Sequence, residues 1–291
     1  MRYFQPISLD EALEIRAAHP VTILAGGTDI YPAKAAREAW GDTREGDILD
    51  ISRLEACRGI QDQGQRFRLG ALTTWTQCLR ADLPPYFDGL KQAAREVGGA
   101  QIQNRGTLAG TLCNASPAAD GVPVLLTLDA AVELAGPAGS RAVPLSEFIV
   151  GYRQTACAQS EIVTAILIPK PDPSARARFL KLGARRYLVI SIVMVAGLLQ
   201  VGPDGRIADL RLAVGACSPV ARRLAGLERR LLGAPGAALR TVEIDAQDLE
   251  ALSPIDDCRA SGSYRSQAAA TLTRRLLLEL GELAAPENRR A

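Results

Sequence analysis

The chain has 291 residues, 47% of them hydrophobic, and its 34 Lys and Arg nearly balance its 32 Asp and Glu. A chain of this length can bury a large core and form one large domain or two of ordinary size. Because the charges balance and no basic cluster is present, we expect the chain to bind neither nucleic acid nor an anionic membrane surface.

Histidine and cysteine content limits the chemistry further. His19 is the only histidine, which excludes Ser-His-Asp hydrolysis, H-E-x-x-H zinc sites and histidine proton shuttles. The six cysteines lie 21 to 60 residues apart and form no C-x-x-C pair, so we expect neither a metal site nor an iron–sulfur cluster. We therefore predict no catalytic side chain and expect the chemistry to come from a bound cofactor.

No segment indicates membrane insertion or export. The longest apolar stretch, residues 188–201, is shorter than the ~20 residues of a membrane-spanning helix and predicts a buried strand. The first residues contain no apolar signal core and no cleavage site. We expect a cytoplasmic protein.

The chain opens with the pattern of a βαβ unit. After an extended segment over 2–5, Ser8 and Glu11 have the spacing of a helix capping box, which predicts a helix over 9–18. A β-branched strand over 21–24 then runs into the loop Ala25-Gly26-Gly27-Thr28-Asp29 and a helix over 30–38.

The middle of the chain mixes helices and strands. Strands are predicted over 47–52, 67–69, 131–134 and 162–168, and helices over 73–80, 88–97 and 122–128. Between them, residues 104–120 concentrate glycine, hydroxyl and amide side chains without helical or strand periodicity. This composition predicts an irregular segment that wraps a polar ligand.

Three prolines within residues 169–173 predict a stiff link and a domain boundary. Beyond it, strands over 179–182, 190–201 and 208–216, with a turn at Gly202–Gly205, form an antiparallel meander. Helices follow over 220–232 and 264–280, with Gly281 as the predicted stop, and we expect the last ten residues to fray.

Both glycine segments are candidate ligand sites. Two glycines between a strand and a helix allow backbone amides to form an anion-binding nest, which suits a diphosphate. The alternative for Gly26 and Gly27 is a tight turn that binds nothing. Since the chain has neither a Rossmann G-x-G-x-x-G after the first strand nor a P-loop, a dinucleotide would bind in another way.

Asp120 and Lys181 complete the candidate residues, each with two readings. Asp120 could accept hydrogen bonds from ribityl or ribose hydroxyls, or it could cap the helix that follows. Lys181 lies in an apolar strand, where it could face a ligand or could be a surface lysine on an edge strand.

These segments together resemble the FAD-binding medium subunits of the xanthine dehydrogenase and carbon monoxide dehydrogenase family over nearly the whole chain. The matching motifs are Phe4-x-Pro6-x-Ser8-Leu9-x-Glu11-Ala12-Leu13, Ala25-Gly26-Gly27-Thr28-Asp29, Asn104-Arg105-Gly106-Thr107, Ala115-Ser116-Pro117-Ala118-Ala119-Asp120, Phe179-x-Lys181-x-x-x-Arg185 and Asp256-Asp257-x-Arg259-Ala260-Ser261-x-x-Tyr264-Arg265. Their order across two domains makes the resemblance specific.

The resemblance implies an α+β fold: an FAD-binding domain of the vanillyl-alcohol-oxidase type over 1–170, with subdomains of about 1–55 and 56–170, and a small C-terminal domain of antiparallel sheet and helices over 175–285. The implied FAD site comprises the two glycine loops, which hold the diphosphate, Asp120 at the ribityl or ribose hydroxyls and Lys181 beside the flavin. Its residues are Ala25, Gly26, Gly27, Thr28, Asp29, Thr107, Leu108, Ala109, Gly110, Thr111, Asp120 and Lys181.

The implied function is electron transfer within a molybdenum hydroxylase. A large molybdopterin subunit would oxidise the substrate, a small subunit with two [2Fe-2S] clusters would relay electrons, and FAD in this chain would pass them to a terminal acceptor, in a dimer of heterotrimers. Where the family has Gly-Gly-Asn, this chain has Ala109-Gly110-Thr111, which removes a carboxamide and adds a methyl group.

That departure keeps a second hypothesis open, a flavin-free structural or assembly subunit. A third, a free-standing flavin oxidase, has no support from a catalytic base or a covalent-flavin histidine. The sequence identifies neither the organic substrate nor the acceptor.

Overall fold

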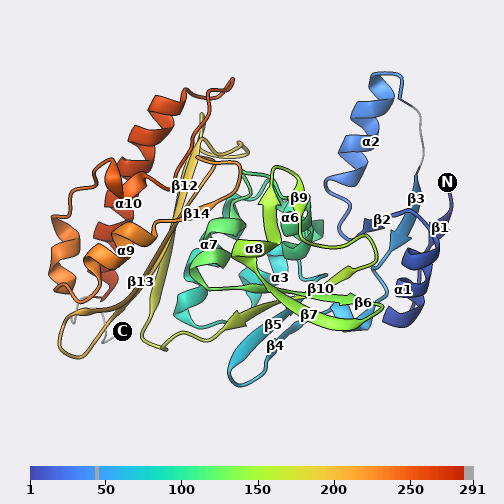
Figure 1. The fold of residues 1–291 in the computed structure, drawn as a ribbon, viewed down its shortest axis with the longest axis horizontal. Helices are drawn as coiled ribbons and strands as arrows, with labels where there is room; N and C mark the ends of the chain where they lie inside the picture. Colours follow the sequence, from blue (N-terminus) through green and yellow to red (C-terminus); the bar gives the residue numbers. More distant parts are fainter. Residues whose placement is uncertain (43–45, 285–291) are drawn as a thin grey trace.

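The computed structural model describes residues 1–42 and 46–284, and it is an α+β fold as the sequence predicts. Figure 1 shows three parts along the long axis of the molecule, with the N-terminal strands at one end and the last helix, α10, at the other. Each part is built around its own sheet. The core of the first two parts is continuous, whereas the third part adds a second hydrophobic cluster.

The first part is a three-stranded parallel sheet. It consists of β1 (Tyr3–Phe4), α1 (Leu9–Ala18), β2 (Val21–Leu24), α2 (Ile30–Ala39) and β3 (Asp47–Asp50). β3 lies between β1 and β2 and pairs with both in parallel, which gives the predicted βαβ opening. The carboxyl end of β2 therefore meets that of β3 where the first glycine loop begins.

The capping box at the start of α1 forms only in part. The Ser8 hydroxyl accepts from the Glu11 amide at 3.2 Å, as the spacing predicts, but the Glu11 carboxylate accepts from Ile7 at 2.9 Å rather than from Ser8. The expected bond from the Ser8 amide to the Glu11 carboxylate is therefore wrong, and the amide of the preceding residue takes its place. The N-terminus of α1 is still capped by Ser8. The Glu11 carboxylate also stays beside the positive end of the helix, whether it accepts from Ile7 or from Ser8.

The second part is a five-stranded antiparallel sheet of order β4-β5-β10-β6-β7 with helices packed on it. Its strands are β4 (Ile60–Asp62), β5 (Arg66–Gly70), β6 (Ala131–Gly136), β7 (Gly139–Pro144) and β10 (Ile162–Pro169), with a separate pair β8 (Ile149–Gly151) and β9 (Gln154–Thr155). Its helices are α3 (Trp75–Arg80), α4 (Asp88–Glu96), α5 (Ala100–Arg105), α6 (Leu108–Asn114), α7 (Gly121–Thr127) and α8 (Leu145–Phe148).

The segment over 104–120 is more regular than its composition predicts. α5 ends at Arg105 and α6 runs from Leu108 to Asn114, so only the junction between them and residues 115–120 are irregular. At the junction, Thr107 forms an isolated antiparallel β-bridge with Thr74. Helices of only six and seven residues leave too little apolar periodicity to be recognised.

The third part is a four-stranded antiparallel meander with helices on its outer face (Figure 1). It consists of β11 (Arg176–Leu182), β12 (Val193–Val201), β13 (Ile207–Gly215), β14 (Arg222–Arg223), α9 (Ala225–Leu231) and α10 (Gly262–Ala284). Several expected boundaries are wrong. The helix expected over 220–232 begins only at Ala225, because β14 occupies Arg222–Arg223. The β12 strand begins at Val193 rather than 190, and α10 continues past Gly281.

Both faces of this meander are buried. Along β12, Met194, Ala196 and Leu198 pack on the core of the second part, while the alternate residues Val193, Val195 and Leu199 pack under α9 and α10. Because successive side chains of a strand point to opposite faces, the sheet is a wall shared by both cores. This explains why the apolar stretch is nearly continuous in sequence.

None of the helices within the described residues has the length and apolar character that a bilayer crossing requires. The polar tail predicted for the last ten residues lies, from residue 285 on, outside the described residues.

Candidate cofactor-binding site

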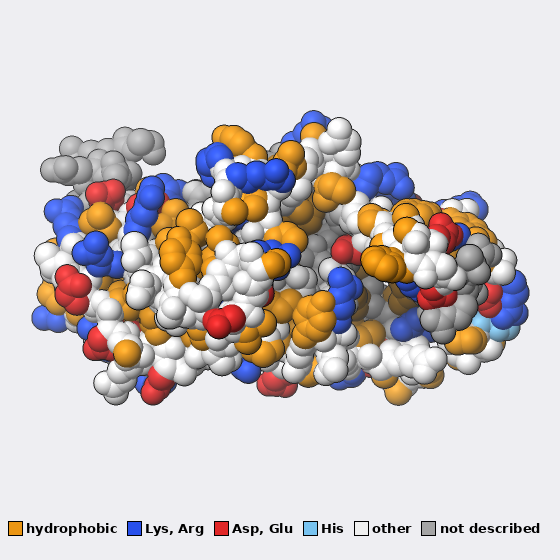
Figure 2. Space-filling view, turned by 90° about the horizontal axis from the view of Figure 1, so that it is seen from above, with side chains coloured by type: hydrophobic (Ala, Val, Ile, Leu, Met, Phe, Trp, Pro, Cys, Tyr) orange, Lys and Arg blue, Asp and Glu red, His pale blue; other side chains and the backbone are white. Residues whose placement is uncertain are grey.

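A cavity of about 600 Å³ lies between the first part of the molecule and the helices of the second. Figure 2 shows the surface hollowed there, beside the end formed by the N-terminal residues. Its volume falls in the range of small-molecule and cofactor sites. The described residues that line it include Val21, Thr22, Ile23, Ala25, Gly26, Gly27, Thr28, Asp29, Ile30, Thr107, Ala109, Gly110, Thr111, Ser116, Ala118 and Ala119.

The first glycine loop follows β2 directly, and both glycines are required by its geometry. A Cβ atom on Gly26 would lie 1.9 Å from the carbonyl oxygen of Arg105, at the end of α5. Gly27 has φ +77°, and a Cβ atom there would also meet the ring of Tyr31 at 2.7 Å. The first loop thus packs its backbone directly on the segment that leads into the second.

This loop leaves a run of backbone amides without a partner. Within the described part of the chain, no hydrogen bond is recorded from the amides of residues 26–30, which form the turn into α2. Asp29 stands at the N-cap position without making a side-chain cap. Unpaired amides at a helix N-terminus that face a cavity suit an anion such as a diphosphate. The carboxylate of Asp29 lines the same cavity and suits a hydroxyl rather than a phosphate.

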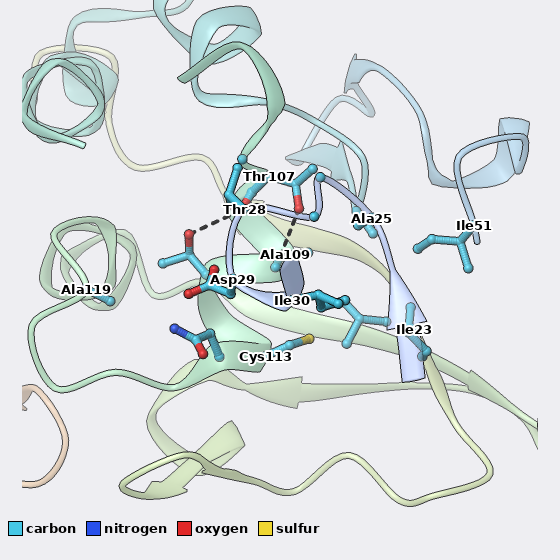
Figure 3. A pocket seen from close by; sticks show the side chains of 18 of the residues that line it. Ile23, Ala25, Thr28, Asp29, Ile30, Ile51, Thr107, Ala109, Cys113 and Ala119 are labelled. Carbon is cyan, nitrogen blue, oxygen red and sulfur yellow. Dashed lines mark hydrogen bonds between the residues drawn. The ribbon is translucent and has the colours of Figure 1, made fainter. Parts of the chain in front are cut away.

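The second loop uses most of its amides within the protein. The amide of Leu108 donates to Thr73 O at 3.0 Å, that of Gly110 to Thr107 Oγ1 at 3.0 Å and that of Thr111 to Thr107 O at 3.1 Å. Among the described residues, no hydrogen bond is recorded from the amides of Thr107 and Ala109. Figure 3 shows Thr107 and Ala109 beside Thr28 and Asp29 of the first loop.

Two predicted site residues of this segment play a different part. The side chain of Leu108 is fully buried in the core and does not line the cavity. The Thr111 hydroxyl donates to Thr107 O at 3.2 Å, one turn back in the same helix. Its proton is thereby used inside α6, so in this arrangement Thr111 offers a ligand only its oxygen lone pairs.

Asp120 and Lys181 meet in a buried pair at the end of the same segment. Lys181 Nζ lies 2.7 Å from Asp120 Oδ2, and the two side chains are 6% and 8% exposed. Ser191 donates to Asp120 Oδ1 at 2.6 Å. Burial raises the pKa of the Asp120 carboxyl, while Lys181 and Ser191, which donate to it, oppose that rise. Neither Asp120 nor Lys181 lines the cavity, although the neighbouring Ala119 does.

The simpler readings of these two residues are both wrong. Asp120 precedes α7 but makes no side-chain cap; its carboxylate oxygens accept from Lys181 and Ser191 instead. Lys181 belongs to the edge strand β11, yet it is buried. It lies two residues from Phe179 and so points to the same face, toward the core of the second part.

The cavity also has lining residues that the sequence does not single out. They are chiefly Arg16, Ile51, Trp75, Ile102, Cys113 and Cys157. Arg16 is fixed by two backbone carbonyls, Glu161 O at 2.7 Å and Val21 O at 3.4 Å. Cys113 is a free cysteine that is exposed where it lines the cavity. These residues come from separate elements without a shared motif, so no sequence signal joins them.

The described residues contain no group of three or more His, Cys, Asp or Glu side chains placed to hold a metal ion. The chemistry of the cavity is that of amides, hydroxyls and apolar walls. Together with the fold, it places the protein in the class whose cavity, with its unpaired backbone amides, suits an anion-bearing cofactor.

Comparison with known proteins gives the family. Residues 1–171 match the family model described as the FAD binding domain in molybdopterin dehydrogenase, and residues 178–280 match the CO dehydrogenase flavoprotein C-terminal domain. The chain belongs to this family, and the resemblance drawn from the motifs is confirmed. It is an oxidoreductase subunit of the FAD-binding type.

Individual relatives are similar over nearly their full length. The putative xanthine dehydrogenase FAD-binding subunit of Escherichia coli is 30% identical, with 95% of this chain and 94% of the relative covered. The nicotinate dehydrogenase FAD-subunit of Eubacterium barkeri is 29% identical, with 96% and 95% covered. Among solved structures, quinoline 2-oxidoreductase from Pseudomonas putida 86 is similar with a TM-score of 0.86 and 26% identity, over 98% of both chains.

Proposed function

We propose that this chain binds FAD and passes electrons from the [2Fe-2S] clusters of a partner subunit to a terminal acceptor, within a molybdenum-containing hydroxylase or dehydrogenase. The observation that carries the proposal is the run of unpartnered amides over residues 26–30, which faces a cavity of about 600 Å³ in a chain of the FAD-binding family. FAD, when bound, supplies the ability to accept and release electrons. The protein supplies position, orientation and exclusion of water.

In the proposed site the two loops have different tasks. The amides of residues 26–30 bind the diphosphate, and the amides of Thr107 and Ala109 close around it from the other side. The carboxylate of Asp29 accepts from a ribityl or ribose hydroxyl. Leu108, Gly110 and Thr111 act mainly by holding α6 in place, and Ala25 by its position at the end of β2.

Asp120 and Lys181 act on the flavin from behind the cavity wall. Because the pair is buried and its charges compensate one another, it places a fixed dipole beside Ala119, which lines the cavity. We propose that this dipole tunes the reduction potential of a bound flavin through the loop that contains Ala119. Ser191 fixes the direction of the carboxylate and so of that dipole.

The proposed partners follow from the relatives. The carbon monoxide dehydrogenase medium chain of Hydrogenophaga pseudoflava and the 6-hydroxypseudooxynicotine dehydrogenase subunit of Paenarthrobacter nicotinovorans are named as parts of larger enzymes. For this chain we propose a large molybdopterin subunit, a small [2Fe-2S] subunit and assembly as a dimer of heterotrimers in the cytoplasm. The proposed division is an FAD-binding domain over 1–170 and a C-terminal domain over 175–285.

Purification of the chain alone and of the chain with its partners tests this function. The isolated chain should be yellow, should be reduced by dithionite, and should show no substrate-dependent reduction of a dye. With its partners, substrate should reduce the flavin. Substrate turnover by the isolated chain would contradict the electron-transfer role.

The second candidate is a flavin-free structural or assembly subunit. The observation that favours it is the second loop, whose Gly110 and Thr111 amides and Thr111 hydroxyl are all bonded within the protein. A complex that turns over substrate while this chain stays colourless, even after refolding with excess FAD, would establish this candidate in place of the first.

A further inference from the structure

Arg265 of α10 joins the ends of two neighbouring strands. The side chain is 3% exposed, and its Nη1 donates to Ile192 O at 2.6 Å and to Ala216 O at 2.9 Å. Its Nη2 donates to Asp257 Oδ1 at 2.7 Å, which neutralises the buried cation. Ile192 immediately precedes β12 and Ala216 immediately follows β13. One guanidinium thus holds β12 and β13 together at the same end of the C-terminal meander.

Each of these strand ends reaches the loop over residues 115–120 by a single hydrogen bond. Ser191, one residue before the first of the two carbonyls, donates to Asp120 Oδ1 at 2.6 Å. The amide of Ala216 donates to Pro117 O at 3.0 Å. Residues on either side of Pro117 line the cavity. We call residues 115–120 the cavity loop.

The backbone conformation of this junction requires restraint. Ala216 has φ +62°, and Ala115, at the start of the cavity loop, has φ +46°. Residues with a Cβ atom adopt this left-handed conformation only where their surroundings impose it. At Ala216 the carbonyl is held by Arg265 and the amide by Pro117 O, so the strained residue is fixed from both sides.

We propose that Arg265 is a positioning residue for the cavity loop, and that through it the C-terminal domain sets the shape of the cavity wall. Arg265 does not line the cavity itself. It acts through the Ser191–Asp120 and Ala216–Pro117 bonds, which lie about one residue from its own contacts. The consequence for a bound flavin rests on the proposed function, whereas the effect on the loop does not.

The test uses the full chain with substitutions at both ends of the connection. Arg265→Lys keeps the charge but cannot reach two carbonyls and a carboxylate in the same plane. Ser191→Ala removes the bond between the start of β12 and the cavity loop and leaves Arg265 intact. Arg230→Lys is the matched control, since Arg230 pairs with the buried Asp248 at 2.6 Å in the same region and has no bond to the cavity loop.

The first readout needs no flavin. Trp75 is 1% exposed, lines the cavity and packs on Gly121, the residue after the cavity loop. The chain has two tryptophans, so Trp40→Phe leaves Trp75 as the only one. Trp40 can be replaced without disturbing the core, because it is 91% exposed. In this background we expect the Trp75 emission to move to longer wavelength in Arg265→Lys and in Ser191→Ala, and to stay unchanged in Arg230→Lys.

The second readout is the FAD dissociation constant together with the visible circular dichroism of the flavin. We expect the constant to rise on the order of threefold to thirtyfold in Arg265→Lys and Ser191→Ala, the range of energetic coupling between connected sites. The double variant should lose less than the product of the two effects, because both act through the same strand end.

Two results would overturn the proposal: an unchanged Trp75 emission in both variants, or an equal change in the Arg230→Lys control. A chain that binds no FAD but still shows the Trp75 change would sustain the positioning role of Arg265 and contradict the proposed function instead.

Discussion

The two glycine loops look equivalent in sequence but differ in what they leave free. The first loop, residues 26–30, has a continuous run of amides with no recorded partner among the described residues. The second, residues 107–111, bonds the amides of Leu108, Gly110 and Thr111 within the protein. The comparison teaches that a glycine-rich motif indicates close approach of backbones, and that only the hydrogen-bond pattern tells which backbone is available to a ligand.

The largest loss of FAD affinity is expected from a substitution at the contact between the two loops. Gly26→Ala places a methyl group against the backbone of Arg105, where no side chain can move aside. Overpacking of about 3 kcal/mol would weaken FAD binding on the order of 100-fold. Flavin fluorescence titration measures the change. The matched control is Gly226→Ala, because a Cβ atom there meets nothing within 4 Å; equal FAD binding by both variants would show that the loops are not in contact.

The second largest effect is expected at Asp50, which supports the first loop, and its size depends on pH. Asp50 ends β3 beside the loop and accepts from Tyr3 at 2.5 Å and from Gln5 and Ser52 at 2.8 Å. Burial raises the pKa of Asp50, but these hydrogen bonds outweigh it, so the pKa lies below its ordinary value. Asp50→Asn, which lacks one acceptor, should lower the free energy of unfolding at pH 7 by about 1–3 kcal/mol.

The pH dependence has a definite sign. A carboxyl whose pKa is lowered by folding contributes stability above its unfolded pKa of about 4, and this contribution is lost as the pH falls below it. The difference between wild type and Asp50→Asn should therefore shrink from pH 5 to pH 3 in urea titrations. A difference that grows toward low pH would contradict the assignment.

The hydroxyl of Thr107 tests the second loop. Its oxygen caps α6 by accepting from Gly110 at 3.0 Å, so Thr107→Val should cost about 1 kcal/mol of stability. In Thr107→Val the Gly110 amide loses its partner in the protein and becomes available to a ligand. FAD binding should therefore change less than stability does. Thermal unfolding with and without FAD measures both. Thr107→Ser should behave as wild type, and a loss of FAD binding in Thr107→Ser would give the threonine methyl group a direct role.

The smallest effect is expected at Thr111. Its hydroxyl donates to Thr107 O inside α6, so Thr111→Val should change the FAD dissociation constant by less than about twofold, or roughly 0.4 kcal/mol. Thr111→Asn restores the carboxamide of the family pattern and should tighten binding. A tenfold loss in Thr111→Val would mean that Thr111 contacts FAD directly, and the contrast between the loops would fail.

Local patterns predicted the fold well where the signal lies in the sequence itself. The βαβ opening with Ser8 as its cap, the strand over 21–24 and the antiparallel meander follow from periodicity, capping and turn residues. The helices α5 and α6 were missed because they are short and interrupted at Gly106. Gly281 did not end α10, since tertiary packing on Leu239 overrides the cost of glycine in a helix.

The candidate site was predictable only in part. Gly26 and Gly27 could be singled out because strand, glycine and helix follow one another in the chain. The pairing of Asp120 with Lys181, 61 residues away, and the approach of Arg16 to the cavity depend on how distant elements pack. Whether an amide is already bonded is likewise a property of the folded chain, which no motif contains.

The most direct test of the central claim is an equilibrium titration of the isolated, flavin-depleted chain with FAD and, separately, with FMN. If the amides of residues 26–30 hold a diphosphate, one FAD should bind per chain, FMN should bind far more weakly, and Gly26→Ala should abolish the preference. Equal affinity for FAD and FMN, or FAD binding that Gly26→Ala leaves unchanged, would contradict the account.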